Sequence, residues 1–214
     1  MIRMQFDQSK PALKRLWQQI ITAKISNQAE CLRRFDTGKV SELDILSQNV
    51  QSGDAGFNES KAAAIYFRAL FGSDFNRREE NILNAALNYG YAIIRGTIAK
   101  QLVLYGLEPS AGIFHRSEVN AWNLADDLIE PYRPVVDFFV RQEVFPKKDV
   151  IAMSPKLKQD LYRLLNVDML LGKERFRVAY AVEKTVQSLQ NSFLRKEPLL
   201  SLPQLIGLEQ HRYE

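Results

Sequence analysis

Residues 9–35 read SKPALKRLWQQIITAKISNQAECLRRF, and this stretch has the apolar spacing of a helix. Its large apolar side chains recur every three or four positions, which is the period of one helix face; they are Leu13, Leu16, Trp17, Ile20, Ile21 and Ile25. Ser9 suits an N-terminal cap and Pro11 suits the first turn. We therefore predict a helix that runs to about Phe35 and stops near Gly38.

The same period recurs along most of the chain. It predicts further helices at about 41–50, 59–71, 78–105, 120–144, 154–166 and 173–193, with Asn58 as the cap of the second of these. Pro131 and Pro134 are expected to kink or restart the fourth. Because no alternating run of useful length and no repeat is present, the sequence predicts an all-α, single multi-helix domain over residues 1–214, with a partly ordered tail at 194–214.

Composition excludes several classes of protein. The chain has 214 residues, 46% of them hydrophobic and 25% charged, so it can bury a core without disulfides. Its one cysteine, Cys31, excludes an intramolecular disulfide and a cysteine-based zinc cluster, and it fits a reducing, cytoplasmic compartment. We expect no signal peptide and no membrane-spanning segment, because no long uncharged apolar run is present.

Charge is distributed unevenly along the chain. The net charge is +4, and residues 1–35 hold seven Lys or Arg against two acids, whereas residues 116–137 hold two Arg against five acids. A basic surface beside a compact acidic spot is what a metal-dependent nuclease needs, since one binds phosphates and the other a cation. Charge runs are also typical of solvated helix faces, and that interpretation remains open.

The acidic spot lies in residues 123–131, NLADDLIEP. Asp126, Asp127 and Glu130 are spaced three and four residues apart, which places them on one helix face. Like charges at this spacing repel, and a bound divalent cation would turn the repulsion into attraction. His115 precedes the cluster by eleven residues in a predicted connection. These features indicate a metal site between helices and one connecting loop, with a solvated acidic helix start as the alternative.

Several short motifs together resemble a known family. They are GDAGFNE (53–59), AAAIYF (62–67), NAALNYGY (84–91), GIFHR (112–116) and LADDLIEPYRP (124–134). In combination they look like the helical domain of the CRISPR-associated integrase, type II branch, the metal-dependent DNA endonuclease that inserts new spacers. The resemblance covers about residues 8–145.

The resemblance implies a site and a reaction. It implies Glu59, His115 and Glu130 as ligands of a catalytic Mg²⁺ or Mn²⁺, with Asp127 as an accessory acid. It also implies attack of a DNA 3′-hydroxyl on a phosphodiester at the edge of a CRISPR repeat.

The resemblance also implies partners. We expect DNA, a second copy of the chain and the small CRISPR-associated adaptation subunit, and no membrane. The basic residues expected to follow DNA are Arg116, Arg95, Lys24, Arg77 and Arg133. The family has an N-terminal β domain that builds its dimer, and we expect this chain to lack it. The alternative is a non-catalytic helical module that binds DNA or a protein.

Overall fold

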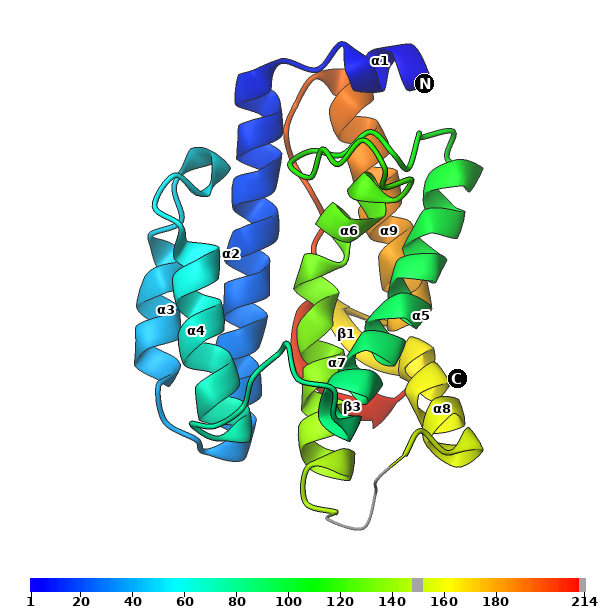
Figure 1. Ribbon diagram of the computed structural model, residues 1–214. Coiled ribbons are helices and arrows are strands. Elements are labelled where there is room, and N and C mark those ends of the chain that lie inside the picture. The colour runs from blue at the N-terminus through cyan, green and yellow to red at the C-terminus, as the bar shows by residue number, and fades with distance from the viewer. Residues whose placement is uncertain (148–151, 212–214) are drawn as a thin grey trace.

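The computed structural model describes residues 1–147 and 152–211, and Figure 1 shows a bundle of helices with a small sheet. The first half contains α1 (Ile2–Phe6), α2 (Lys10–Phe35), α3 (Val40–Gln48), η1 (Ser52–Asp54), α4 (Asn58–Phe71) and α5 (Ile82–Leu104). The middle contains α6 (Asn123–Leu128), η2 (Glu130–Tyr132), α7 (Arg133–Phe139) and the π-helical turn η3 (Val140–Val144). The last part contains α8 (Pro155–Tyr162), η4 (Arg163–Asn166), β1 (Val167–Leu171), β2 (Glu174–Arg177), α9 (Val178–Arg195) and β3 (Gln204–Gln210).

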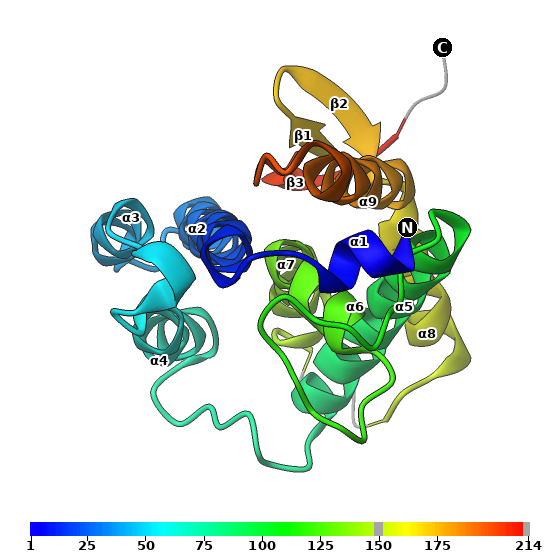
Figure 2. The ribbon, with the colours of Figure 1, turned by 90° about the horizontal axis from the view of Figure 1, so that it is seen from above.

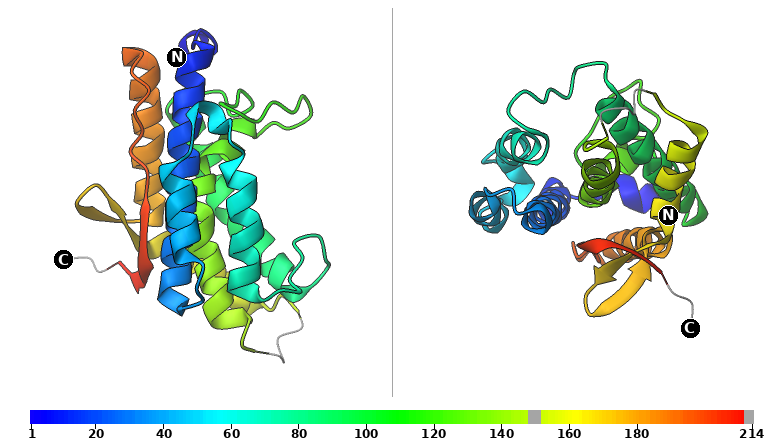
Figure 3. Two further views of the ribbon diagram at one scale, coloured as in Figure 1. Left: turned by 90° about the vertical axis from the view of Figure 1, so that its left-hand side faces the viewer. Right: turned by 90° about the horizontal axis from the view of Figure 1, so that it is seen from below.

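Helix α2 begins and ends where the sequence predicts. Ser9 Oγ accepts a hydrogen bond from Ala12 N at 3.3 Å, and Asp36 ends the helix in the left-handed region with φ +48°. Helices α3 and α4 pack on one side of α2, and α7 packs on another (Figure 2). In the side view, α2 runs along most of the length of the bundle, with other helices beside it (Figure 3). Its buried face includes Lys24, Asn27 and Gln28 among the apolar residues, so polar groups lie inside the bundle.

The prediction of an all-α fold is wrong, because β1, β2 and β3 form a three-stranded antiparallel sheet in the order β2-β1-β3. All of β1 except Leu170 is buried, so its sequence VDMLL shows no polar–apolar alternation and resembles the end of a helix. The turn to β2 is made by Gly172 and Lys173, with Gly172 at φ +63°. The helix predicted at 173–193 therefore begins only at Val178, and β3 forms in the segment predicted as a tail.

A buried amide ties the sheet to the middle of the bundle. Asn27 Nδ2 on α2 donates to Pro131 O at 2.8 Å and to Pro203 O at 3.0 Å. Asn27 Oδ1 accepts from Leu205 N on β3 at 3.0 Å. One side chain thus fixes α2, the η2 turn and the start of β3 relative to one another.

Helices α5 and α7 cross closely at Gly90, which is buried. A Cβ at Gly90 would overlap Val136 Cγ1, whereas a Cβ at Gly96 on the same helix would meet no other atom within 4 Å. Gly90→Ala is therefore expected to lower the free energy of unfolding by about 1–3 kcal/mol through overpacking. Gly96→Ala is the control and is expected to raise it by about 1 kcal/mol through helix propensity. Urea unfolding measures both, and equal stabilisation by the two variants would contradict the close crossing.

A buried carboxyl joins α4, α5 and α7. Asp137 is fully buried and accepts hydrogen bonds from Tyr66 Oη at 3.0 Å and from Tyr91 Oη. Burial raises the pKa of Asp137 to about 6, although both tyrosine hydroxyls oppose the shift. The folded state therefore holds this proton more tightly than the unfolded chain, whose aspartates titrate near pH ~4.

Stability is therefore expected to fall as pH rises through this window. The free energy of unfolding should decrease by up to about 3 kcal/mol between about pH 4 and pH 6, because ionised Asp137 is penalised only in the folded state. Asp137→Asn should lack this component of the pH dependence. Thermal melting of both proteins over this range tests the prediction, and parallel pH profiles would contradict it.

No helix in residues 1–147 or 152–211 combines the length and the hydrophobicity that crossing a membrane requires.

Candidate metal centre

Glu59 is placed by a turn that caps α4. Asp54 Oδ1 accepts from Asn58 N at 2.8 Å, and Asp54 Oδ2 accepts from Glu59 N at 3.1 Å. The prediction that Asn58 caps this helix is wrong, because Asn58 is its first residue and its amide instead donates to Leu46 O. Gly53 has φ +71° and lies against the Lys14 stem, so this turn brings the start of α4 to the side of α2.

Glu130 lies opposite Glu59 at the start of η2, and its side chain is only 5% exposed. Arg133 Nε donates to Glu130 Oε1 at 2.8 Å. Lys24 Nζ is 2.5 Å from Glu130 Oε2 and 2.7 Å from Glu59 Oε1. The Lys24 ammonium group therefore lies between Glu59 and Glu130, which are two of the three predicted metal ligands.

The opposite charges in this cluster keep one another ionised. Burial alone would raise the pKa of Glu130, but Lys24 and Arg133 outweigh it and hold that pKa below its ordinary value. Burial alone would lower the pKa of Lys24, but Glu130 and Glu59 raise it. Glu130 Oε2 is buried and lies 2.5 Å from Lys24 Nζ, so the ammonium group is the partner of this oxygen.

His115 is held by Asp127, which is fully buried on α6. Asp127 accepts from the backbone N–H groups of Ile113 at 2.5 Å, Phe114 at 3.0 Å and His115 at 3.1 Å. Its Oδ1 is also 2.6 Å from His115 Nδ1, and this hydrogen bond raises the pKa of His115. Nδ1 is thereby engaged with a carboxylate, which leaves Nε2 as the ring nitrogen available to a ligand.

The loop that carries His115 packs closely on itself and on α6 at Gly112. A Cβ at Gly112 would overlap His115 O and would lie 2.9 Å from Asp127 Oδ2. Asn123, which is buried, closes the loop by donating to Ser110 O and Ser117 O. Asn123 is not among the residues predicted for the site, although an amide side chain three residues before Asp126 is a usable signal in the sequence.

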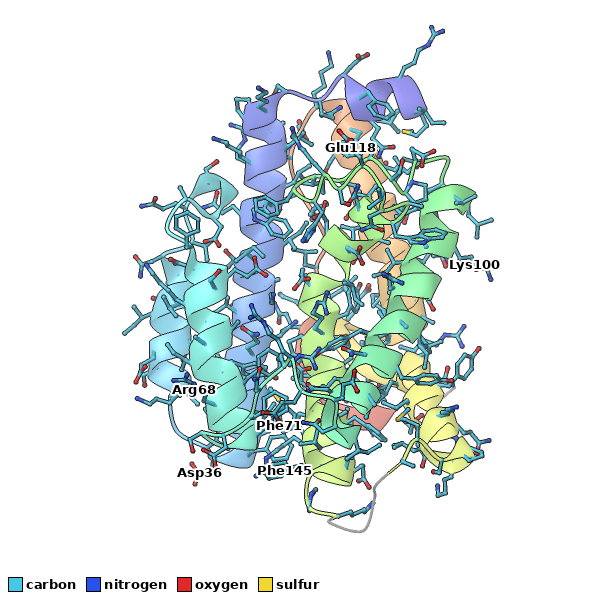
Figure 4. All side chains as sticks on the ribbon, in the orientation of Figure 1. Asp36, Arg68, Phe71, Lys100, Glu118 and Phe145 are labelled. Carbon is cyan, nitrogen blue, oxygen red and sulfur yellow. The ribbon has the colours of Figure 1, made fainter. Side chains whose placement is uncertain are left out.

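His115 opens onto a cavity of about 510 Å³ at the α1 end of the bundle. Polar and basic residues line it near the histidine, namely Lys10, Arg116, Ser117 and Asn120. Glu118, in the same loop, is labelled at this end in Figure 4. Arg116 is exposed here and is the nearest predicted DNA contact to His115 in the chain.

The predicted ligands therefore form two neighbouring pairs. Glu59 and Glu130 share the Lys24 cation, and His115 is bound to Asp127, three residues before Glu130. Within residues 1–147 and 152–211, no three acidic, histidine or cysteine side chains are grouped closely enough to hold a metal ion together.

The donor set fits a hard divalent cation. Two carboxylate oxygens already converge on one positive centre, and His115 is the predicted nitrogen ligand. Oxygen ligands suit Mg²⁺ and Mn²⁺, and one imidazole is compatible with Mn²⁺.

The other predicted DNA contacts also have protein partners. Arg133 lies over the Tyr91 ring at 4.6 Å besides binding Glu130. Arg77 donates to Asn84 and to Asn88, and Arg95 is 3.4 Å from Asp126. Whether these residues and Lys24 contact DNA stays a prediction.

Known proteins resemble this chain in sequence and fold. The family model "CRISPR associated protein Cas1" matches residues 1–150. A CRISPR-associated endonuclease Cas1 from Neisseria meningitidis is 40% identical over an alignment that covers 100% of this chain and 71% of the relative. A casposase bound to integration product has a TM-score of 0.75 at 19% identity, covering 93% of this chain and 70% of that one. A partial Cas6-RT-Cas1–Cas2 complex gives 0.74 at 18% identity, covering 94% and 72%.

Proposed function

Because this chain belongs to the Cas1 family of CRISPR-associated proteins, we propose that it is a DNA endonuclease and integrase that inserts new spacers into a CRISPR array. The family resemblance seen in the short motifs is confirmed by a relative aligned over the whole chain. The reaction is phosphodiester hydrolysis and transesterification, in which a DNA 3′-hydroxyl attacks a phosphodiester at the repeat edge.

The ligands in this proposal are Glu59, Glu130 and His115. The carboxylates supply oxygens from opposite sides of the cluster, and His115 supplies Nε2. A bound Mg²⁺ or Mn²⁺ supplies Lewis-acid polarisation of the scissile phosphate and neutralises its developing charge. Asp127 keeps His115 in the tautomer that leaves Nε2 free, and Arg133 holds Glu130 through Oε1.

One observation carries the proposal. Two carboxylates from distant parts of the sequence meet at one buried positive centre, and they are two of the three residues that the motifs single out. Placing two carboxylates on one ammonium group that is only 9% exposed costs solvation for each buried charge, so ion pairing for stability alone does not favour this arrangement.

The partners in this proposal are those of an integrase. They are DNA, a second copy of this chain and a small Cas2-type subunit, with the cytoplasm as the compartment. Two similar structures are a casposase bound to integration product and a partial Cas6-RT-Cas1–Cas2 complex, which supports DNA and a Cas2-type subunit as partners. The basic residues around the His115 cavity supply a surface for phosphates.

A melting scan with Mn²⁺ and with EDTA tests the metal site, and a strand-transfer assay on repeat DNA tests the activity. A ligand specific to the folded state stabilises it by about 2.7 kcal/mol at one hundred times its dissociation constant. We expect a Mn²⁺-dependent rise in melting temperature and Mn²⁺-dependent joining of DNA ends. A non-catalytic binding module would show neither effect, and that result would refute the proposal.

A further inference from the structure

Lys24 is the one basic side chain in the described part of the chain that is ion-paired with two of the proposed ligands. Its side chain is 9% exposed, and Nζ lies 2.7 Å from Glu59 Oε1 and 2.5 Å from Glu130 Oε2. Lys24 is on α2, whereas Glu59 begins α4 and Glu130 begins η2, so this contact links three elements.

Resting on the proposed function, we propose that Lys24 is a positioning residue that holds Glu59 and Glu130 together before the metal ion binds, and that the metal ion displaces its ammonium group. The ammonium serves as an internal counter-ion. Without it, two carboxylates would face each other in a poorly solvated interior, where like charges repel strongly.

Displacement follows from the shared lone pairs. A Mg²⁺ or Mn²⁺ ion held by these carboxylates would use the same oxygen lone pairs that now face Nζ. Glu130 Oε1 is held by Arg133, which also stacks on Tyr91, so Oε2 is the oxygen that remains for another cation. That oxygen would exchange its contact with the Lys24 ammonium group for a contact with the metal ion.

The charge balance points the same way. Lys24 and Arg133 together neutralise the two carboxylates, so a divalent ion that entered without expelling a cation would leave two uncompensated positive charges. Of the two cations, Lys24 is the one that can move. Its stem is flexible and its Glu59 partner is 30% exposed, whereas Arg133 is held by Glu130 and by the Tyr91 ring.

The first test is Mn²⁺ affinity, measured from the EPR signal of free Mn²⁺ with wild type, Lys24→Met and Lys100→Met. Methionine keeps a similar length without the charge, and Lys100 is an exposed residue on α5 that points away from the bundle in Figure 4. We expect Lys24→Met to bind Mn²⁺ at least about tenfold more tightly, equivalent to about 1.4 kcal/mol. It should also melt at a lower temperature in EDTA. Lys100→Met should match wild type.

The second test uses the unmodified protein, so it does not depend on the folding of a variant. Amine acetylation followed by mass spectrometry should find Lys24 protected in EDTA and labelled in saturating Mg²⁺. Lys100 should be labelled equally in both.

The outcomes separate the two proposals. Equal or weaker Mn²⁺ binding by Lys24→Met, or Lys24 protected while Mg²⁺ raises the melting temperature, overturns the displacement and leaves the proposed function standing. Failure of both wild type and Lys24→Met to bind Mn²⁺ overturns both. A merely structural role for Lys24 would lower stability in EDTA without tightening Mn²⁺ binding.

Discussion

Glu130→Gln is expected to reduce Mn²⁺-dependent strand transfer by at least about a hundredfold, the scale seen when one preorganised charge-stabilising group is removed from an active site. Glutamine preserves the shape of the side chain but removes the negative charge that would bind the metal ion. It also leaves Lys24 and Arg133 facing a neutral group, so the ion would enter an environment with excess positive charge. Initial rates of end joining at saturating Mn²⁺ measure the effect.

Glu59→Gln provides the check on folding, because Glu59 is 30% exposed and its loss leaves Glu130 paired with both cations. The same loss of strand transfer is expected, with a melting temperature in EDTA close to that of wild type. Glu80→Gln is the matched control, since Glu80 is an exposed acid before α5. Strand transfer at the wild-type rate in folded Glu59→Gln or Glu130→Gln would remove that residue from the proposed ligand set.

Asp127→Ala is expected to lower the free energy of unfolding by about 3–5 kcal/mol, the cost of removing one partner from a buried charged network. The carboxylate accepts three backbone N–H groups and the His115 ring, and alanine leaves all of them without an acceptor. Urea unfolding measures the loss.

Asp126→Ala is the control on the neighbouring residue, whose partners are Asn120 and Arg95 near the surface. Its expected effect is below about 1 kcal/mol, the usual range for exposed pairs. If Asp127→Ala were as mild as Asp126→Ala, the backbone contacts of Asp127 would not hold the His115 loop.

The helices could be predicted because their signals are local. Ser9 and Pro11 start α2, Gly72 follows α4, and the apolar spacing between such positions is regular. The sheet could not be predicted in the same way. The strand β1 is buried on both faces, and its partner β3 lies more than thirty residues away, so neither has a periodic pattern that identifies it alone.

The residues of the candidate site could be predicted from the sequence, but the contacts between them could not. The motifs single out Glu59, His115 and Glu130, but no spacing rule states that α2 supplies a lysine between the two acids. A signal existed, because Lys24 occupies a position on the apolar face of α2 where an uncharged residue is expected. Likewise, the acceptors of Asp127 are backbone groups, which every residue carries and which sequence therefore cannot distinguish.

The Asn27 amide connects the strand β3 to the turn that carries Glu130. It donates to the carbonyl directly after Glu130 and to the residue before β3, and it accepts from β3 itself. A molecule that displaces β3 would break hydrogen bonds of the same Asn27 amide that is bound to Pro131 O, next to Glu130. Loss of the β3 contacts is therefore expected to loosen the turn that carries Glu130.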